Sequence, residues 1–330
     1  MKLFSLIMIF AIVIATAGFA QAIDPSPLLL GKYPVPNWVK PGLVVVYQYE
    51  GGSQSGRSAV SGRGFMIDIV TNVENNRIYG IEFLILVSPS TYEITVQPIK
   101  VTPLFVFIHP SQIQDLLGQA GMLAQQGIVV RGGRFSENSI WLEIADSVSS
   151  TALWVSNEGF VQRFQHLERT PEGSAVVQRQ YLKHSYIDWP DIEDFPPVFQ
   201  ESHTYNIYVS AYGMITPSGN VNYQLLNAQG RILMYRLVQY SSGVPIPSEI
   251  MGVPSFGPFY IHPKLLQKGV ILEIPEIGFV WQNEQGEYGV DSVVYFNGQA
   301  CFRASLNERG LMIRVQYLYG GFVLMTELAQ

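Results

Sequence analysis

The sequence predicts a mainly β fold with few helices, built as two tandem copies of a bent antiparallel sheet with one helix against the sheet. Many short segments rich in Val, Ile, Tyr and Phe are separated by Gly, Asn, Ser or Pro, which is typical of antiparallel strands. Three short signatures recur in the same order in the two halves. In each half, a His-Pro pair precedes a segment with helix-forming character.

The strands of the first half are expected in six segments that end at polar or glycine-containing turns: Leu43–Tyr49, Phe65–Val70, Ile78–Val87, Val129–Val130, Ile140–Ile144 and Val176–Leu182. Asn and Gly predict hairpin turns at Asn75-Asn76 and at Glu158-Gly159. In the second half, the same residue types predict turns at Asn227–Gly230 and at Arg309-Gly310. The segment Arg77–Val87 is apolar on both faces, which predicts a sheet covered on both faces or curved around a cavity.

The recurring signatures indicate an internal duplication. The first is an Arg-Ile pair, which starts at Arg77 and again at Arg231. The second is an Ile-His-Pro triplet, which starts at Ile108 and again at Ile261. The third is a Gly followed by Arg at +4, Gln at +6 and Leu at +8, which starts at Gly159 and again at Gly310. From the Arg to the His the spacing is 32 residues in the first half and 31 in the second. From the His to the Gly it is 50 and 48 residues. Because this period is far longer than that of a solenoid repeat, the signatures predict a duplicated domain.

The expected boundaries follow from these signatures and from proline content. A proline-rich arm at 23–36 precedes a first repeat at 37–187, and a linker at 188–201 leads to a second repeat at 202–330. The linker holds four carboxylates and several prolines. The prolines exclude a helix or a central strand there. Its carboxylates lack the spacing and the turn glycine of a calcium-binding loop, so we interpret it as a solvated connection.

One long helix is expected from Ser111 to Gln126. Its apolar stripe has helical spacing and consists of Ile113, Leu116, Leu117, Ala120 and Ala124. Pro110 stands in the first turn, where a missing N–H has no cost. The counterpart Pro263–Gly269 is shorter and ends on glycine. If the sheet bends around a cavity, the long helix is its lid and the first repeat holds the ligand.

Residues 1–22 have the pattern of a secretory signal peptide. One early Lys precedes an apolar run that reaches Ala17, and a small-x-small pattern ends at Ala22. We expect cleavage between Ala22 and Ile23, giving a secreted or periplasmic protein with no integral membrane segment. The alternative is an uncleaved anchor, which the length of the run disfavours because a helical span needs about 20 apolar residues.

The composition and charge of the chain limit the classes of partner that it could bind. The chain carries 20 basic and 26 acidic side chains with no basic cluster, which argues against nucleic acid as a partner. Apolar residues make up 48% of the chain, enough for two ordinary cores. The single cysteine, Cys301, excludes an internal disulfide and is expected to be a small buried hydrophobe.

The segment from Leu153 to Arg163 resembles a hairpin of the lipoprotein-carrier-type half-barrel proteins of the bacterial envelope. In those proteins a Trp-containing strand turns at a glycine into a strand that carries a basic residue, as Trp154, Gly159 and Arg163 do here. The second repeat keeps the turn and Arg314 but has no Trp. The resemblance implies a strongly bent antiparallel sheet, a helix that closes one side, and an apolar cavity for lipid.

Two motifs resemble catalytic loops, but the residues in and around them do not match those loops. Gly51–Ser58 is similar to a phosphate-binding loop, but Arg57 stands where that loop has Lys, and a strand rather than a helix is expected after it. Within it, Gly52–Gly56 is the segment nearest to a serine nucleophile elbow, and it has Gln54 where the elbow has serine. We interpret the segment as a hairpin loop.

The titratable residues do not predict a catalytic or metal site either. The five histidines lack the spacing of zinc ligands: His109, His166, His184, His203 and His262. The two that precede a helix proline are expected to cap or pack locally. Asp68, Glu82 and Glu143 fall on separate strands and are expected on solvated faces, although paired-carboxylate catalysis stays open. No catalytic, metal or cofactor-binding residue is therefore predicted, and no cofactor.

Three functions remain open. The first is an exported, non-catalytic protein that binds or carries an apolar ligand such as lipid in a bent-sheet cavity. The second is a structural or interaction protein whose tandem β domains contact a protein of the envelope. The third is an extracellular hydrolase. An apolar cavity would favour the first, and filled sheets with an exposed apolar patch would favour the second.

Overall fold

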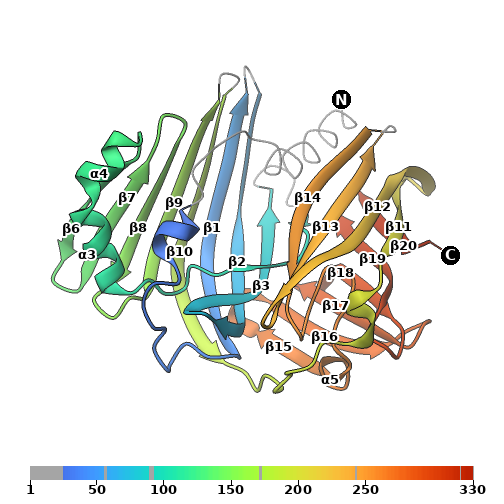
Figure 1. The fold of residues 1–330 in the computed structure, drawn as a ribbon. Coiled ribbons are helices and arrows are strands. Elements are labelled where there is room, and N and C mark those ends of the chain that lie inside the picture. The colour runs from blue at the N-terminus through green and yellow to red at the C-terminus, as the bar shows by residue number, and fades with distance from the viewer. Residues whose placement is uncertain are drawn as a thin grey trace. The chain divides into compact units, whose positions relative to one another are not determined.

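A computed structural model describes residues 25–55, 58–88, 93–170, 173–241, 244–319 and 321–329. Strand makes up 63% of the structure, and the paired strands from β3 to β20 run antiparallel, which confirms the mainly β prediction (Figure 1). The expected signal peptide at 1–22 lies outside the described residues. Within the described ranges, the helices are too short or too polar to cross a membrane.

The chain forms two compact units. Among the described residues, the smaller unit comprises those of Met1–Val35, Tyr47–Arg63 and Phe105–Leu182, and the larger unit comprises those of Pro36–Val46, Gly64–Leu104 and Lys183–Gln330. The long strands β1 (Leu43–Ser55) and β2 (Ser58–Glu74) contribute residues to both. This division crosses the expected repeat boundaries, because residues 64–104 group with the second half of the chain.

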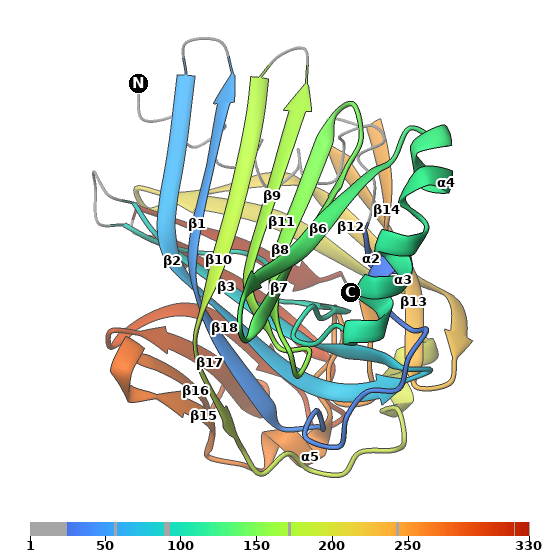
Figure 2. The same cartoon turned by 90° about the vertical axis from the view of Figure 1, so that its left-hand side faces the viewer.

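The smaller unit is an antiparallel sheet with helices on one face. Consecutive hairpins join β6 (Val129–Ser136), β7 (Ser139–Ala145), β8 (Ser149–Ser156), β9 (Val161–Thr170) and β10 (Gly173–Tyr186). Figure 2 shows α3 (Pro110–Gly118) and α4 (Ala120–Gln125) alongside β6 to β8. Strand side chains that include Leu142, Leu153 and Val155 form a core with the helices. The expected helix against a sheet is therefore present.

The predicted single helix is interrupted. Gln119 leaves the helical conformation, with φ −95° and ψ 2°, and separates α3 from α4. Ile113 and Leu116 are buried as expected, but Ala124 is exposed and Leu123 packs into the core instead. The interruption changes the rotational phase of the last turns, so a stripe drawn with continuous helical spacing places the wrong residue inward. The helices pack on the buried side chains of this core.

The arm before the first repeat packs on α3. It forms the short helix α2 (Ser26–Leu29), and Leu29 and Leu30 are buried in the core of the smaller unit. The Gln112 amide donates to the Leu28 carbonyl at 2.6 Å. Tyr33 stacks on His109 with ring centroids 4.7 Å apart. The arm is thus part of the folded unit.

The larger unit is one antiparallel run of strands. Its order begins with β2 and β3 (Arg77–Val87), and β4 (Ile94–Val96) and β5 (Lys100–Pro103) follow one another along the other edge of β3. From β5 the order continues with β14 (Val244–Gly252), β13 (Ile232–Ser241), β12 (Met214–Gln229), β11 (His203–Ala211), β20 (Phe322–Leu328), β19 (Met312–Tyr319), β18 (Gln299–Leu306), β17 (Val290–Phe296), β16 (Phe279–Gln285) and β15 (Val270–Ile274). Helix α5 (Pro263–Leu266) and the 3₁₀ turns Pro197–Gln200 and Pro275–Ile277 complete it. Figure 1 shows β12 and β13 as long curved strands.

Two apolar cores fill the larger unit. One surrounds Trp281, whose indole N–H donates to Ser292 at 2.8 Å, and it includes Phe83 and Phe279. It also contains Cys301, whose thiol donates to a backbone carbonyl and whose pKa burial raises to about 12. Cys301 is therefore the small buried hydrophobe that the sequence predicts. The second core is rich in tyrosine and centres on Phe259.

Most expected hairpin turns occur where the sequence places them. Asn75 and Asn76 have φ of 50° and 60°, and Gly159 and Gly310 have φ of 90° and 79°. The turn expected at Asn227–Gly230 is wrong in its start, because β12 continues to Gln229 and the turn consists of Gly230 and Arg231. A bulge between Leu225 and Asn227 lets the strand run on through the asparagine.

The His and Gly signatures form the same local structure twice. In the first His–Gly junction, Ile108 N–H donates to the Gly159 carbonyl at 2.8 Å, and in the second, Ile261 N–H donates to the Gly310 carbonyl at 3.0 Å. In both, the histidine Nδ1 accepts a backbone N–H two residues later at 3.1 Å, as expected of a cap. The duplication itself stays a prediction, which these matching junctions support.

Candidate functional site

One face of the curved sheet in the larger unit is apolar and only partly buried. Cα partners in antiparallel strands share a face, which relates Tyr223 to Leu237 and Leu324 to Tyr317. We name this the inner apolar face and define it by six side chains of intermediate exposure: Tyr223, Leu237, Ile250, Tyr317, Tyr319 and Leu324. They come from β12, β13, β14, β19 and β20, so distant segments build it.

The lower part of the same face is filled. Tyr205 and Tyr235, on the same face of β11 and β13, are buried in the tyrosine-rich core. The Tyr205 hydroxyl donates to the Met312 carbonyl at 2.6 Å, and the Tyr235 hydroxyl donates to the Phe199 carbonyl at 3.2 Å. The phenols of the core are thus held by the backbone, and most side chains of the inner apolar face pack against this core.

The hydroxyls of the three tyrosines on the inner apolar face are buried. Burial raises the pKa of Tyr223 to about 12 and raises the pKa values of Tyr317 and Tyr319 still further above their usual range. These side chains nevertheless keep accessible surface. Each phenol oxygen is therefore buried in protein while another part of the same side chain stays accessible.

The hairpin of β11 and β12 exposes apolar side chains at its tip. Tyr212, Met214 and Ile215 are 81%, 69% and 63% exposed. No Asp, Glu, Lys or Arg occurs from Thr204 to Gly230. Exposed apolar groups in an uncharged hairpin are a feature of surfaces that contact a partner.

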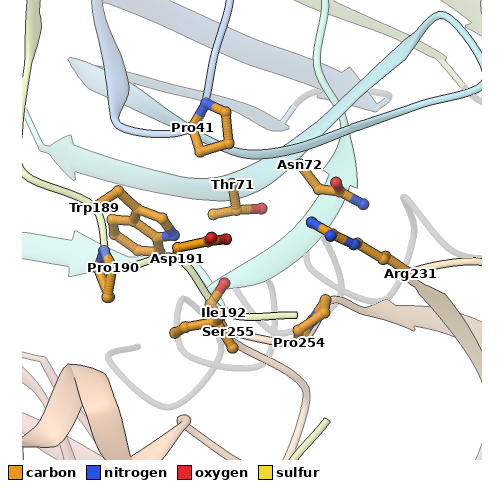
Figure 3. A pocket seen from close by; sticks show the side chains of 10 residues that line it. All are labelled: Pro41, Thr71, Asn72, Trp189, Pro190, Asp191, Ile192, Arg231, Pro254 and Ser255. Carbon is orange, nitrogen blue, oxygen red and sulfur yellow. The ribbon is translucent and has the colours of Figure 1, made fainter. Parts of the chain in front are cut away.

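A second feature of the larger unit is a polar pocket of about 240 Å³ (Figure 3). Its lining residues come from five chain segments: Pro41, Thr71, Asn72, Trp189, Pro190, Asp191, Ile192, Arg231, Pro254 and Ser255. In the view of Figure 3, the Trp189 ring and the Arg231 guanidinium lie on either side of Asp191. We name it the linker pocket, because residues 189–192 belong to the expected linker.

The expected linker packs onto the larger unit on both sides of this pocket. Its four carboxylates are exposed, but Ile192 and Val198 are buried in the two cores. The Lys264 ammonium donates to the Asp191 carbonyl at 3.0 Å. Gly42, with φ of 90°, allows the close approach, since a Cβ there would overlap the Ile187 carbonyl oxygen. The linker is therefore an ordered wall of the pocket.

The carboxylates considered for catalysis are engaged locally. Glu82 forms an ion pair with Lys100 at 3.1 Å, and Glu143 accepts from the Ser150 hydroxyl at 2.8 Å. Asp68 is fully buried, not solvated as expected. The structure does not place any of the three in the linker pocket or on the inner apolar face.

The histidines take structural roles, and two of them, His109 and His262, cap helices. His166 exchanges a hydrogen bond with Thr151 at 2.9 Å, and His203 packs on Phe259 with ring centroids 4.7 Å apart. His184 contacts the ring of Tyr186. Across the residues that the structure describes, no group of three His, Cys, Asp or Glu side chains could hold a metal ion.

The two motif-bearing hairpins have ordinary strand geometry. Residues 56–57 of the Gly51–Ser58 segment lie outside the described residues, and β2 begins directly after them, so the segment after the loop is a strand as expected. In the hairpin of β8 and β9, Arg163 lies 4.7 Å from the centre of the Trp154 ring. This cation–π pair explains why a basic residue faces the tryptophan there. The resemblance to lipoprotein carriers remains a prediction.

Comparison with known proteins gives no assignment. No protein-family model matches the chain, and no curated protein matches it. A solved structure of a protein with unknown function from the DUF3598 family of Nostoc punctiforme aligns with 86% of this chain and 95% of its own, at 10% identity and a TM-score of 0.16. A DNA polymerase sliding clamp from Pseudomonas aeruginosa aligns with 93% of this chain and 96% of its own, at 8% identity and a TM-score of 0.12. Scores this low do not show a common fold.

Proposed function

We propose that this chain is an exported, non-catalytic protein that binds or carries an apolar ligand, such as lipid, on the inner apolar face of its larger unit. Export is inferred from residues 1–22, and secretion or a periplasmic location follows from it. The observation that carries the binding proposal is the set of partly accessible apolar side chains whose phenols are strongly desolvated. This site differs from the one expected under the long helix of the first repeat, where side chains such as Leu142 and Leu153 pack in a core with the helices.

The curvature of the sheet supports this proposal. Five strands, with β11 between β12 and β20, present Leu, Ile and Tyr against a core that is already packed. Covering such surface with an acyl chain gains about 25 cal/mol per Å² of apolar area. The Tyr319 hydroxyl already donates to the Val96 carbonyl at 3.2 Å, so the Tyr223 hydroxyl is the group that would contact a carboxyl or ester group of the ligand.

A second candidate function has its own observation. The exposed tip with Tyr212, Met214 and Ile215 favours an interaction protein that contacts an envelope partner. The two candidates differ in what they require. Ligand binding depends on the inner apolar face, whereas partner binding depends on the tip.

The first test uses a fluorescent fatty acid, cis-parinaric acid, and lipid extraction from the purified full chain. The double variant Leu237→Gln, Leu324→Gln places two amides on the inner apolar face, and we expect the affinity to fall by about ten-fold or more. The matched control is Leu226→Gln, a leucine on the same sheet that is exposed. It should bind like the parent chain.

Circular dichroism and urea unfolding establish that the variants are folded. The double variant Met214→Ser, Ile215→Ser should also keep fatty-acid binding, since the tip is not part of the inner apolar face. A parent chain that shows no saturable binding and yields no lipid by mass spectrometry would contradict the carrier proposal. Equal loss in the control and in the inner-face variant would contradict the assigned site.

A further inference from the structure

The linker pocket has a chemistry that the apolar-ligand proposal does not use. We propose that it binds a small, uncharged polyhydroxyl ligand of the size of a single sugar ring. This site is separate from the inner apolar face, and it is built by residues of the larger unit alone.

The size and walls of the pocket suit such a ligand. A volume of about 240 Å³ is below the range of roughly 300–1,000 Å³ in which drug-sized molecules bind. Three prolines, Trp189 and Ile192 supply apolar walls for the C–H faces of a ring. An extended chain or a large aromatic ligand would not fit this space.

The polar groups match hydroxyls better than charges. Arg231 already donates to Glu193 at 2.8 Å, so much of its charge is neutralised and its other N–H groups remain as donors. Asp191 adds acceptor oxygens, and Ser255 and Thr71 add hydroxyls. A sugar hydroxyl both donates and accepts, so it can use each of these groups, whereas an anion would meet the Asp191 carboxylate.

The strongest indication is an unsatisfied amide. Asn72 lines the pocket and is 5% exposed, yet its side-chain nitrogen has no hydrogen-bond partner among the described residues. Leaving a buried amide unpaired is costly, and native structures do so at few places. An asparagine that costs stability in the free protein and lies in the wall of a pocket is typical of a residue kept for binding.

The site is also held in place before a ligand arrives. Thr71 Oγ donates to the Tyr79 carbonyl at 3.3 Å, and Lys264 holds the backbone of Asp191. Ser255 lies in a tight turn, in which Val253 and Phe256 exchange backbone hydrogen bonds at 2.8 and 3.1 Å. Preorganised groups lose little entropy on binding, which is what a small ligand with few contacts needs.

Calorimetric and NMR titrations with glucose test the proposal, with glycine and acetate as a zwitterion and an anion of smaller size. We expect saturable, millimolar binding of glucose and none of the other two. Asn72→Leu should weaken it by about ten-fold, the equivalent of one buried hydrogen bond. The control Asn227→Leu changes an exposed asparagine of β12 and should leave binding unchanged.

Thermal unfolding separates a binding role from a structural one. Asn72→Leu removes an unpaired buried amide, so the ligand-free variant should melt at the same temperature as the parent chain or higher. Absence of saturable glucose binding would overturn the proposal, as would equal weakening by both variants. A lower melting temperature for Asn72→Leu would show that this side chain is a structural element, and binding of glycine or acetate instead would refute the polyhydroxyl assignment.

Discussion

The first and second His–Gly junctions have the same backbone bonds but support different structures. At the first, the capped helix continues through α3 and α4 to Gln125, whereas at the second, α5 ends at Leu266. The cap itself needs only a histidine, a proline and a left-handed glycine, all within reach of local sequence. The length of the helix depends on what covers it.

The third residue after each histidine shows this dependence. At the first junction it is Gln112, whose amide reaches the carbonyl of Leu28 in the arm. At the second it is Leu265, which is fully buried in the core that surrounds Trp281. Asn283 then donates to the Leu265 carbonyl at 2.8 Å and closes the short helix. Equivalent positions have therefore adapted to an arm in one case and to a strand in the other.

The largest expected effect comes from the junction glycines. A Cβ at Gly159 or Gly310 would overlap the carbonyl oxygen of Ile108 or Ile261, and both glycines have positive φ. Alanine at either position should lower the free energy of unfolding by about 3 kcal/mol. Gly213→Ala is the matched control, since its φ is 77° but its Cβ would meet nothing within 4 Å, and it should cost only about 1 kcal/mol. Urea unfolding measures all three, and equal costs would show that the junction contacts do not matter.

Substituting Leu265 with glutamine and Gln112 with leucine should have smaller and unequal effects on the free energy of unfolding. Leu265→Gln buries an amide without a partner and should cost about 2 kcal/mol. Gln112→Leu removes an amide whose oxygen is already unpaired and should change stability by less than about 1 kcal/mol. Urea midpoints for the two variants check this. If Gln112→Leu were the more costly, the arm contact would be worth more than the hydrogen-bond geometry indicates.

The smallest effect concerns pH. Burial, followed by the charge of Lys264, lowers the pKa of His262 below its usual 6.5 in the folded state. The unfolded chain then binds more protons below this value, so stability should fall as the pH drops through about 6.5 and should continue to fall until the folded-state pKa is passed. His262→Asn keeps a cap without a titrating ring and should show a shallower fall between about pH 7.5 and pH 5.

Urea midpoints across this pH range measure the difference between the parent chain and His262→Asn. Burial also lowers the pKa values of His166 and His203, so both chains keep part of the dependence. Identical curves for the two chains would mean that the second junction does not contribute to the pH response.

Features set by short stretches of chain were predictable. The strands, the turns at Asn75 and at both junction glycines, and the histidine caps all follow from local propensity and from φ preference. The break at Gln119 was not predicted, because apolar spacing alone cannot tell a continuous helix from two short helices with a changed phase. The strand that continues through Asn227 likewise required the register of its neighbour.

The candidate sites were beyond sequence reasoning for a different reason. The linker pocket gathers Asn72, Trp189 and Arg231 from segments that are far apart in the chain, and no local motif joins them. The only signal was indirect, since Arg231 belongs to a recurring signature and Trp189 stands in the proline-rich linker. The inner apolar face depends on the pairing of β11 with β20, the first and last strands of the second half.

The sequence by itself determined the mainly β character, the two equivalent junctions and the expectation of export, because each rests on local propensity or on a short motif. Only the tertiary structure decided which strands pair, and so which residues form the two compact units. Pairing across long loops depends on the total burial that each arrangement achieves, and many partners are locally equivalent. For the same reason, the faces and pockets on which the proposed functions depend exist only once the strands are in register.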